Sequence, residues 1–184
     1  MSTEGEHSTS KALILRHASP QEVDLAASIL TEAAEWSMGI GNPHPWPRPF
    51  PSEILQRSAD RGELFLAETA SHEIAGTLTL QWEDPLFWGV QPPVAGYLHR
   101  LALRRAFAGQ GLGRRMIQWA EERVRERGRE FLRLDCDAEN ARIRSYYEAL
   151  EFRFVSDAEK PGVPFRCALY QKRVAHRASP RGRS

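Results

Sequence analysis

Residues 108–114 read Ala108-Gly109-Gln110-Gly111-Leu112-Gly113-Arg114 and stand between an apolar stretch that ends at Leu103 and an amphipathic stretch that begins near Arg114. Glycine accepts a positive φ and lets the backbone approach a ligand closely. The N–H groups that begin a helix point outward with the positive end of the helix dipole. The stretch therefore predicts a strand-to-helix connection that binds a phosphate or pyrophosphate. Taken alone, it is equally typical of a structural turn.

Two common phosphate-binding motifs fit this stretch poorly. A P-loop needs Lys and then Ser or Thr after its last glycine, whereas Arg114 and Arg115 follow Gly113. A dinucleotide fingerprint fits better, because Asp135 ends the next predicted strand. That motif normally opens a larger, doubly wound fold, and here about four strands precede it. A nucleotide-binding protein is therefore the weakest functional alternative.

Strand and helix patterns alternate on both sides of the glycine-rich stretch. Strands are predicted at 13–15, 64–69, 74–82, 97–103, 131–136, 152–155 and 165–170. Helices are predicted at 20–34, 52–61, 114–127 and 140–150. The start of the first helix is indicated by Ser19, Pro20 and Glu22. A capping serine, a proline in the first turn and a glutamate three residues after the serine favour a helix start. The pattern predicts a mixed α/β domain of about seven strands and four helices.

The composition fits one globular domain. The 184 residues are 41% hydrophobic and 27% charged, and 25 basic against 24 acidic side chains leave a formal charge of +1. These values exclude a disordered chain, a coiled coil and a collagen-like repeat, and they argue against broad electrostatic binding of nucleic acid. No apolar run approaches the ~20 residues of a membrane span, and the N-terminus lacks the apolar core of a signal peptide. A cytoplasmic protein without nucleic-acid or membrane partners is expected.

The domain is expected to span residues 11–173. Residues 1–10 are small and polar, and residues 174–184 are basic without an acid, so both ends are predicted as disordered tails. Cys136 and Cys167 are too few for a disulfide framework and lack zinc-ligand spacing, so both are predicted to be reduced thiols. No metal site is expected.

A proline at every second position from Pro43 to Pro51 makes one loop stand out. The chain must be extended and stiff there, and aromatic residues alternate with the prolines. Two interpretations stay open. The loop forms one wall of an acceptor site, or it is an ordinary covering loop whose Trp46 and Phe50 seal the core.

Taken with what flanks it, the glycine-rich stretch resembles the GNAT superfamily of N-acetyltransferases. That family couples an apolar strand end, an Arg/Gln-x-x-Gly-x-Gly/Ala loop, a helix, a strand, and an Asn before a helix that bears a Tyr and ends in Gly-Phe. The matching positions here are Leu101-Ala102-Leu103, 108–113, 132–135, Asn140, Tyr147 and Phe152. The likeness implies an acyl-CoA N-acyltransferase fold, whose mostly antiparallel sheet contains one splayed parallel pair.

The same resemblance implies acetyl-coenzyme A as cosubstrate. Its pantetheine arm is expected to pair with the backbone of the apolar strand end, and its pyrophosphate to bind N–H groups of the loop and helix start. The expected cofactor-binding residues are Leu101, Ala102, Leu103, Gly109, Gln110, Gly111, Leu112, Gly113, Arg114 and Asn140. Two positions depart from the family. Ala108 replaces an Arg or Gln, and Glu151 replaces a glycine that closes the last helix in a left-handed conformation.

Acetyl transfer to an amine needs a base and an acid, because an alkyl ammonium titrates near 10. The resemblance implies that Tyr147 protonates the leaving thiolate, although it is alternatively a core aromatic residue. Strand alternation places His99 on one face with Tyr97 and Leu101, and Asp135 ends the neighbouring strand. Both are candidate bases. A structural, hydrogen-bonded His99 and a water chain without a dominant base stay open.

The function expected from the sequence is direct acetyl transfer to a primary amine of a small molecule. Several acids near the expected acceptor side favour a cationic amine, unless they are merely solvated: Glu32, Glu35, Glu53, Glu83 and Asp84. A protein N-terminus or lysine is the alternative acceptor, and a non-catalytic acyl-CoA-binding or sensor domain is the alternative class. A homodimer stays open.

Overall fold

The computed structural model describes residues 13–42, 46–159 and 165–174. Its strands form one seven-stranded sheet in the order β1-β2-β3-β4-β5-β7-β6. Neighbouring strands are antiparallel except β4 and β5, which are parallel. The strands are β1 (Leu13–His17), β2 (Leu64–Thr69), β3 (Ile74–Gln81), β4 (Ala95–Leu103), β5 (Phe131–Asp137), β6 (Arg153–Ala158) and β7 (Cys167–Arg173).

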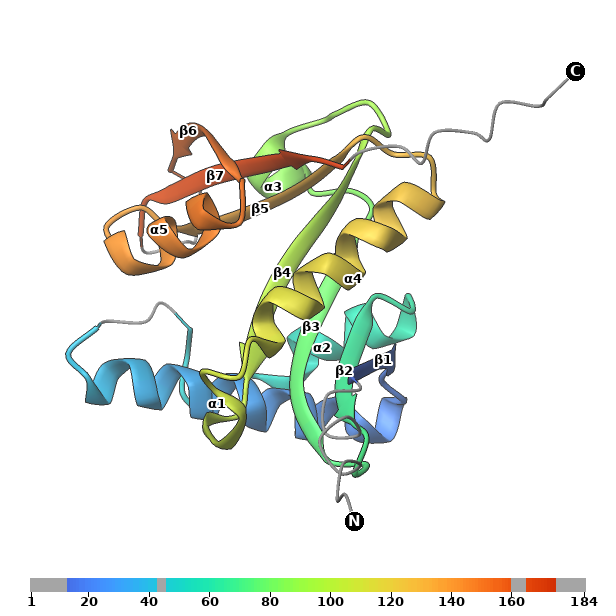
Figure 1. Ribbon diagram of the computed structural model, residues 1–184, viewed down its shortest axis with the longest axis vertical. Coiled ribbons are helices and arrows are strands. Elements are labelled where there is room, and N and C mark those ends of the chain that lie inside the picture. The colour runs from blue at the N-terminus through green and yellow to red at the C-terminus, as the bar shows by residue number, and fades with distance from the viewer. Residues whose placement is uncertain (1–12, 43–45, 160–164, 175–184) are drawn as a thin grey trace, which may run out of the picture.

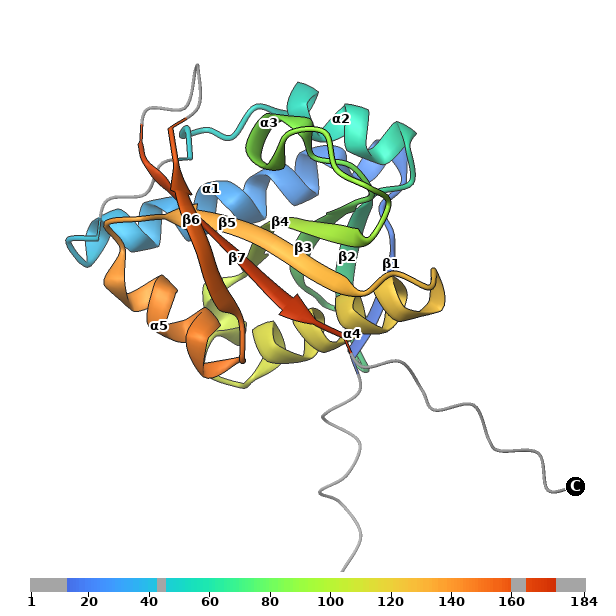
Figure 2. The ribbon, with the colours of Figure 1, turned by 90° about the horizontal axis from the view of Figure 1, so that it is seen from above.

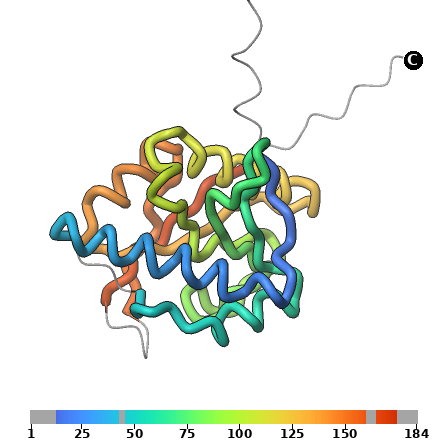
Figure 3. The backbone as a smooth tube through the Cα atoms, turned by 90° about the horizontal axis from the view of Figure 1, so that it is seen from below, coloured from blue at the N-terminus to red at the C-terminus, as the bar shows by residue number. Residues whose placement is uncertain are grey.

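Helices cover both faces of this sheet (Figure 2). The α-helices of the described residues are α1 (Val23–Gly39), α2 (Ser52–Asp60), α3 (Pro85–Trp88), α4 (Leu112–Glu126) and α5 (Ala141–Ala149). α1 and α2 lie side by side on one face (Figure 3), and α3 lies on the same side, while α4 and α5 cover the other. The fold class predicted from the sequence is confirmed. No helix in the described part of the chain is both long and apolar enough to cross a membrane.

The sequence predicted about four helices and missed α3. This helix has only four residues, so it leaves no hydrophobic period to read. It begins at a proline, and the Asp84 side chain caps it by accepting a hydrogen bond from the Phe87 N–H at 3.2 Å. The predicted start of the first helix is confirmed in outline: a 3₁₀ turn at Pro20–Glu22 precedes α1, and Glu22 Oε2 accepts from the Ser19 N–H at 2.9 Å.

Each face of the sheet has its own apolar core. The α4 face buries side chains of β2 to β5 against the apolar stripe of α4, for example Leu78, Leu98 and Met116. The opposite face buries Ala102 and residues of β2 against α1 and α2. The helices contribute, for example, Ile29 of α1 and Leu55 of α2 to this core. Fully burying such aliphatic side chains stabilises a fold by about 1.5–3 kcal/mol each. These two cores fix how β4 lies between α1 and α4.

β4 and β5 separate after a short paired segment. Their register runs from Ala95–Phe131 to Leu98–Leu134 and then stops, while β4 stays paired with β3 as far as Leu103. β5 turns away with β7 (Figure 1). The backbone edge of β4 beyond Leu98 therefore has no strand partner on the β5 side. This is the splayed parallel pair that the sequence predicted.

A one-residue bulge interrupts β4 at Arg100. Thr77 of β3 faces Ala102 and Thr79 faces His99, so three steps along β4 match two along β3. Arg100 has a φ of 52°, in the left-handed region. Bulges of this kind re-aim the side chains that follow them.

The bulge corrects one expectation. Tyr97 and His99 share the α3 face of the sheet, where they contact Trp88 and Phe87, but Leu101 packs into the α4-side core. Strand alternation had put Leu101 on the face of His99. The extra residue at Arg100 reverses the alternation, so that prediction is wrong.

Of the two predicted tails, only Val174 lies within the described residues. Residues 1–10 and most of 174–184 fall outside the described residues. Val174, which was assigned to the tail, is only 2% exposed, and its N–H donates to the carbonyl of Glu130. Lys172 pairs with Glu121 at 2.8 Å. The packed domain therefore extends at least to Val174.

Candidate active site

A cavity of about 720 Å³ opens where β4 and β5 separate. Its walls come from α1, the segment after residue 46, β4, the start of α4, the end of β5 and α5. The predicted site residues that line it are His99, Leu101, Ala102, Leu103, Gly109, Gly111, Leu112, Gly113, Arg114, Asp135, Asn140 and Tyr147. Gln110 does not line it, because its side-chain amide instead donates to the carbonyl of Ala106 at 3.1 Å.

The glycine-rich stretch forms one end of the cavity. Gly109 and Gly111 have φ values of 77° and 76°, and Gly111 is the N-cap of α4. The first-turn N–H groups of a helix have no intrahelical acceptor, so those of α4 are available at the cavity. A Cβ added at Gly113 would lie 2.9 Å from Tyr146 Oη. The absence of side chains therefore leaves the start of α4 open to an anion.

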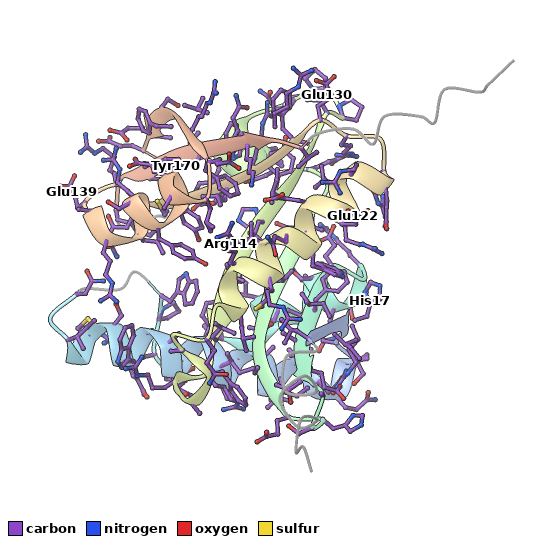
Figure 4. The ribbon with its side chains drawn as sticks, in the orientation of Figure 1. His17, Arg114, Glu122, Glu130, Glu139 and Tyr170 are labelled. Atoms are coloured by element: carbon purple, nitrogen blue, oxygen red, sulfur yellow. The ribbon has the colours of Figure 1, made fainter. Side chains whose placement is uncertain are left out.

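Arginines supply positive charge at the same end. Arg105, Arg114 and Arg142 line the cavity (Arg114 lies in the first turn of α4, Figure 4). The Arg105 guanidinium lies 4.5 Å and that of Arg142 5.9 Å from the centre of the Trp36 ring, within cation–π range. These cations offset the loss of charge at Ala108, where the family usually has Arg or Gln.

Asn140 caps the N-terminus of α5. Its Oδ1 accepts a hydrogen bond from the Ile143 N–H at 3.1 Å, and the residue also lines the cavity. The Asn140 side chain therefore stabilises the start of α5, in addition to its expected contact with the coenzyme. An N-cap of this type stabilises a helix by about 1 kcal/mol.

Tyr147 lies on the inner face of α5 and is 8% exposed. The centre of its ring lies 5.7 Å from that of Phe152 and 6.5 Å from that of Tyr170 of β7. Its hydroxyl has no hydrogen-bond partner among the described residues. Burial raises the pKa of the Tyr147 phenol well above its usual range, so the group stays protonated, as a proton donor must.

His99 lies between two carboxylates on the α3 face of the sheet. Its Nδ1 is 3.3 Å from Asp135 Oδ1, and its Nε2 is 3.4 Å from Asp84 Oδ2. Burial of the ring lowers the pKa of His99, but the carboxylates of Asp135 and Asp84 outweigh this effect and raise it to about 9. His99 is therefore mainly an imidazolium at neutral pH.

The same three side chains contain donor types that bind metals, with donor atoms within 4.8 Å of one another. However, the two carboxylates face different nitrogens of one imidazole ring. The lone pairs of Nδ1 and Nε2 point apart, so a single ion cannot take His99 together with both carboxylates as they lie. The arrangement favours an imidazolium, whose two N–H groups each face one carboxylate.

Cys136 lines the cavity beside Asp135. Burial and the Asp135 charge raise the pKa of its thiol to about 12. Since the thiolate is the nucleophile, this environment argues against an acyl-enzyme at Cys136. Both cysteines are buried thiols, as expected.

Aromatic and aliphatic side chains form one wall at the other end of the cavity, near His99 and Asp135. Trp46 and Phe50 of the proline-rich loop meet edge to face there, with ring centres 6.1 Å apart, and they also pack against the α1 core. Ile54 of α2 and Phe87 of α3 complete this wall. The described part of the loop thus covers the core, as one of the two interpretations held, and it also lines the cavity. Residues 43–45 lie outside the described residues.

The acids expected to attract a cationic acceptor do not surround this end. Of Glu32, Glu35, Glu53, Glu83 and Asp84, only Glu32 lines the cavity. Its carboxylate is already bound by Arg104 Nη1 at 3.1 Å and by the Arg105 N–H at 2.6 Å. A polycationic acceptor therefore finds no free carboxylate in that group.

The sequence profile of the acetyltransferase (GNAT) family matches residues 28–152, well over half of the chain. The chain belongs to this family. The N-acetyltransferase class of enzyme expected from the sequence is thereby confirmed. Among curated proteins, an uncharacterised N-acetyltransferase of Bacillus subtilis (strain 168), YesJ, is 29% identical over 143 residues, which cover 73% of this chain and 78% of the relative.

Solved structures show the same fold. A GNAT-family acetyltransferase from Listeria monocytogenes is 27% identical with a TM-score of 0.70, covering 88% of this chain and 94% of its own. The putative acetyltransferase yncA from Salmonella typhimurium, solved with acetyl-CoA, is 15% identical with a TM-score of 0.65, covering 92% and 98%. PaiA N-acetyltransferase from Thermoplasma acidophilum, solved with coenzyme A, is 17% identical with a TM-score of 0.66, covering 88% and 99%.

In this GNAT enzyme, two residues of the site escaped sequence reasoning. Asp84 was noted only as an acid near the acceptor, and Arg100 was not singled out. The one signal for Asp84 was its place before Pro85, which is typical of a helix N-cap. For Arg100, the signal was a second polar residue directly after His99 in the strand Tyr97-Leu98-His99-Arg100-Leu101.

Proposed function

We propose that this GNAT enzyme transfers the acetyl group of acetyl-coenzyme A to a primary amine of a small molecule by direct attack. The observation that carries the proposal is one continuous cavity with two unlike ends. The start of α4 offers N–H groups and Arg114 to a pyrophosphate, and the far end holds His99 and Asp135. The coenzyme-bound structures of similar fold support the same assignment.

The splayed edge of β4 suits the coenzyme arm between these ends. Leu101, Ala102 and Leu103 line the cavity, and β5 has left this edge of the strand. Free backbone groups there are available to the amides of the pantetheine arm. A free N–H of the same edge is the proposed donor to the oxyanion that forms when the amine attacks the thioester carbonyl.

His99 is the proposed base. The attacking nitrogen forms a bond to the carbonyl carbon, and its proton passes to the neutral imidazole. The neighbouring carboxylates raise the pKa of His99 to about 9, which brings its basicity close to that of an alkyl amine. The active form is the minor one at neutral pH, so activity is expected to rise with pH up to about 9. Asp135 and Asp84 orient the ring.

Tyr147 is the proposed acid. As the carbon–sulfur bond breaks, the phenol gives its proton to the leaving thiolate and regains one from solvent. Its hydroxyl has no competing partner among the described residues, and its pKa is raised by burial. The proton is therefore retained until a thiolate is present.

Calorimetric titration with acetyl-coenzyme A, followed by a thiol-release assay over a panel of amines, tests this proposal. Binding together with amine-dependent release of coenzyme A is the expected result. Binding without release for any amine supports a non-catalytic acyl-CoA sensor instead. Absence of binding at millimolar acetyl-coenzyme A overturns the proposal, and transfer only to peptide N-termini or lysines overturns the small-molecule acceptor.

A further inference from the structure

Arg100 is a charged residue of the cavity that the proposed mechanism does not use. It lines the cavity beside His99, and its Nη1 atom is buried without a hydrogen-bond partner in the described residues. The bulge in β4 holds it there with a φ of 52°, a conformation that costs a non-glycine residue on the order of 1 kcal/mol. Such strain is retained where the surroundings impose it, often at ligand sites.

No carboxylate of the described residues forms an ion pair with Arg100. Asp135, Asp84 and Glu63 attract its guanidinium only from a greater distance. Asp135 and Asp84 already hold His99, and Glu63 accepts a hydrogen bond from Gln81 at 3.1 Å. Burial lowers the pKa of Arg100 from its usual value. A cation with a buried donor that has no partner is costly, so an anion that enters the cavity gains a preformed site.

The walls around Arg100 restrict what else the acceptor carries. Trp46, Phe50, Ile54 and Phe87 line the same end of the cavity and present apolar surface. Ligand sites of this kind combine apolar walls with a few polar groups that fix orientation. The acceptor thus needs an apolar body and one anionic group in addition to its amine.

The bulge also sets the spacing between the anion and the amine. His99 and Arg100 are consecutive, and the residue inserted at the bulge sends Leu101, not Arg100, into the α4-side core. The proposed base and the unpaired guanidinium are therefore neighbours at one end of the cavity. An amine and a carboxylate on the same or adjacent carbon atoms match neighbouring partners.

We propose that Arg100 binds a carboxylate of the acceptor, and that the acceptor is a free amino acid with an apolar side chain. Guanidinium and carboxylate form two parallel hydrogen bonds, which fixes the orientation of the acceptor as well as its charge. A peptide N-terminus carries no carboxylate next to its amine, so it lacks this contact. The inference rests on the proposed acetyl transfer and specifies its substrate class.

The test compares matched acceptors with and without the carboxylate. Leucine and phenylalanine are assayed against isopentylamine, phenethylamine and leucinamide, at saturating acetyl-coenzyme A. We expect kcat/KM at least tenfold higher for the two amino acids. Arg100→Gln is expected to remove this preference by raising KM for the amino acids at least tenfold, with little change for the plain amines. Arg100→Lys is expected to keep part of the preference, because lysine keeps the positive charge but cannot form the two parallel hydrogen bonds of a guanidinium.

Arg153→Gln serves as the control, because Arg153 is exposed on β6 and does not line the cavity. It should leave all five acceptors unchanged. Plain amines used as well as amino acids by the wild-type enzyme overturn the inference. Equal losses for both acceptor groups in Arg100→Gln overturn it as well, since they indicate a purely structural role.

Failure of the inference is distinguishable from failure of the proposed function. Transfer to plain amines but not to amino acids refutes the amino-acid acceptor while acetyl transfer stands. If no amine is acetylated, the proposed function fails, and the carboxylate site is judged by binding alone. In that case calorimetry of the protein with coenzyme A must detect leucine binding that Arg100→Gln weakens, or the inference fails too.

Discussion

The imidazole of His99 on β4 faces the carboxylate of Asp84, the cap of α3, with Nε2 3.4 Å from Oδ2. Asp135 lies on the other side of the ring, 3.3 Å from Nδ1. The two carboxylates come from segments on either side of β4, and neither alone encloses the ring. In the proposed mechanism, the basicity of His99 therefore depends on Asp84, the N-cap residue of a four-residue helix.

Replacing Asp84 is therefore expected to move the pH dependence of acetyl transfer. The two carboxylates raise the pKa of His99 to about 9, so Asp84→Asn removes one stabiliser of the imidazolium and lowers that pKa. The rising limb of kcat/KM should shift from about pH 9 to lower pH with the same acceptor. A limb that stays in place contradicts the role of His99 as base. Glu83→Gln, which changes the neighbouring exposed acid, should cause no shift.

Tyr147→Phe is expected to lower kcat by about 10- to 100-fold, a conservative share of what general acids contribute. The affinity for acetyl-coenzyme A and the melting temperature should change little, because the hydroxyl has no partner among the described residues. Unchanged turnover would remove Tyr147 from the mechanism.

Tyr170→Phe is the matched control for Tyr147→Phe. The Tyr170 hydroxyl accepts from Arg144 Nε at 3.0 Å and donates to Glu148 Oε1 at 2.7 Å. Its loss should lower the free energy of unfolding by about 1 kcal/mol or more, with little effect on kcat. The two variants thus separate a catalytic hydroxyl from a structural one.

Gly113→Ala is expected to weaken binding of acetyl-coenzyme A by about tenfold, or about 1.4 kcal/mol. The new methyl group would lie 2.9 Å from Tyr146 Oη, so the ring must shift at the start of α4. Calorimetric titration measures the effect. Gly39→Ala in α1 is the control, because its methyl group meets no atom within 4 Å. Equal affinity in both variants would count against an anion site at the start of α4.

Glu151→Gly is expected to stabilise the fold by about 1 kcal/mol. Glu151 follows α5 with a φ of 67°, so a glycine relieves the left-handed strain of a non-glycine residue. The Glu151–Lys172 ion pair, 3.6 Å long with an 85% exposed glutamate side chain, contributes little against this gain. Chemical denaturation measures the change. Glu151→Gln removes the charge but keeps the strain, and it should be close to neutral.

Local sequence patterns were sufficient to predict much of the fold. The glycines at 109 and 111 indicated the strand-to-helix turn, Ser19 and Glu22 indicated the start of α1, and Glu151 does adopt the left-handed conformation that the family position implies. Each of these features depends on residues that are close in the chain. Their chemistry is therefore readable without knowledge of the tertiary structure.

The candidate site was harder to predict from the sequence, because it depends on contacts between residues that are far apart in the chain. A bulge leaves no periodic pattern, so the sequence put Leu101 on the wrong face and gave no reason to single out Arg100. The approach of Asp84 to His99 requires α3 to fold back over the sheet, and α3 is too short to be recognised. Only the packed fold makes those residues neighbours.

The bulge in β4 divides one strand into two independently variable parts. Leu98, His99 and Arg100 line the cavity before the bulge, and Leu101, Ala102 and Leu103 line it after the bulge. In the proposed function, only the second part binds the acyl donor, and it does so through backbone hydrogen bonds that do not depend on the side chains present. Mutation at positions 98–100 is then expected to change acceptor choice without disturbing the recognition of a common acyl donor. A lineage with this strand can diversify its substrates while keeping one donor, and directed evolution of new acceptors should begin on the N-terminal side of the bulge.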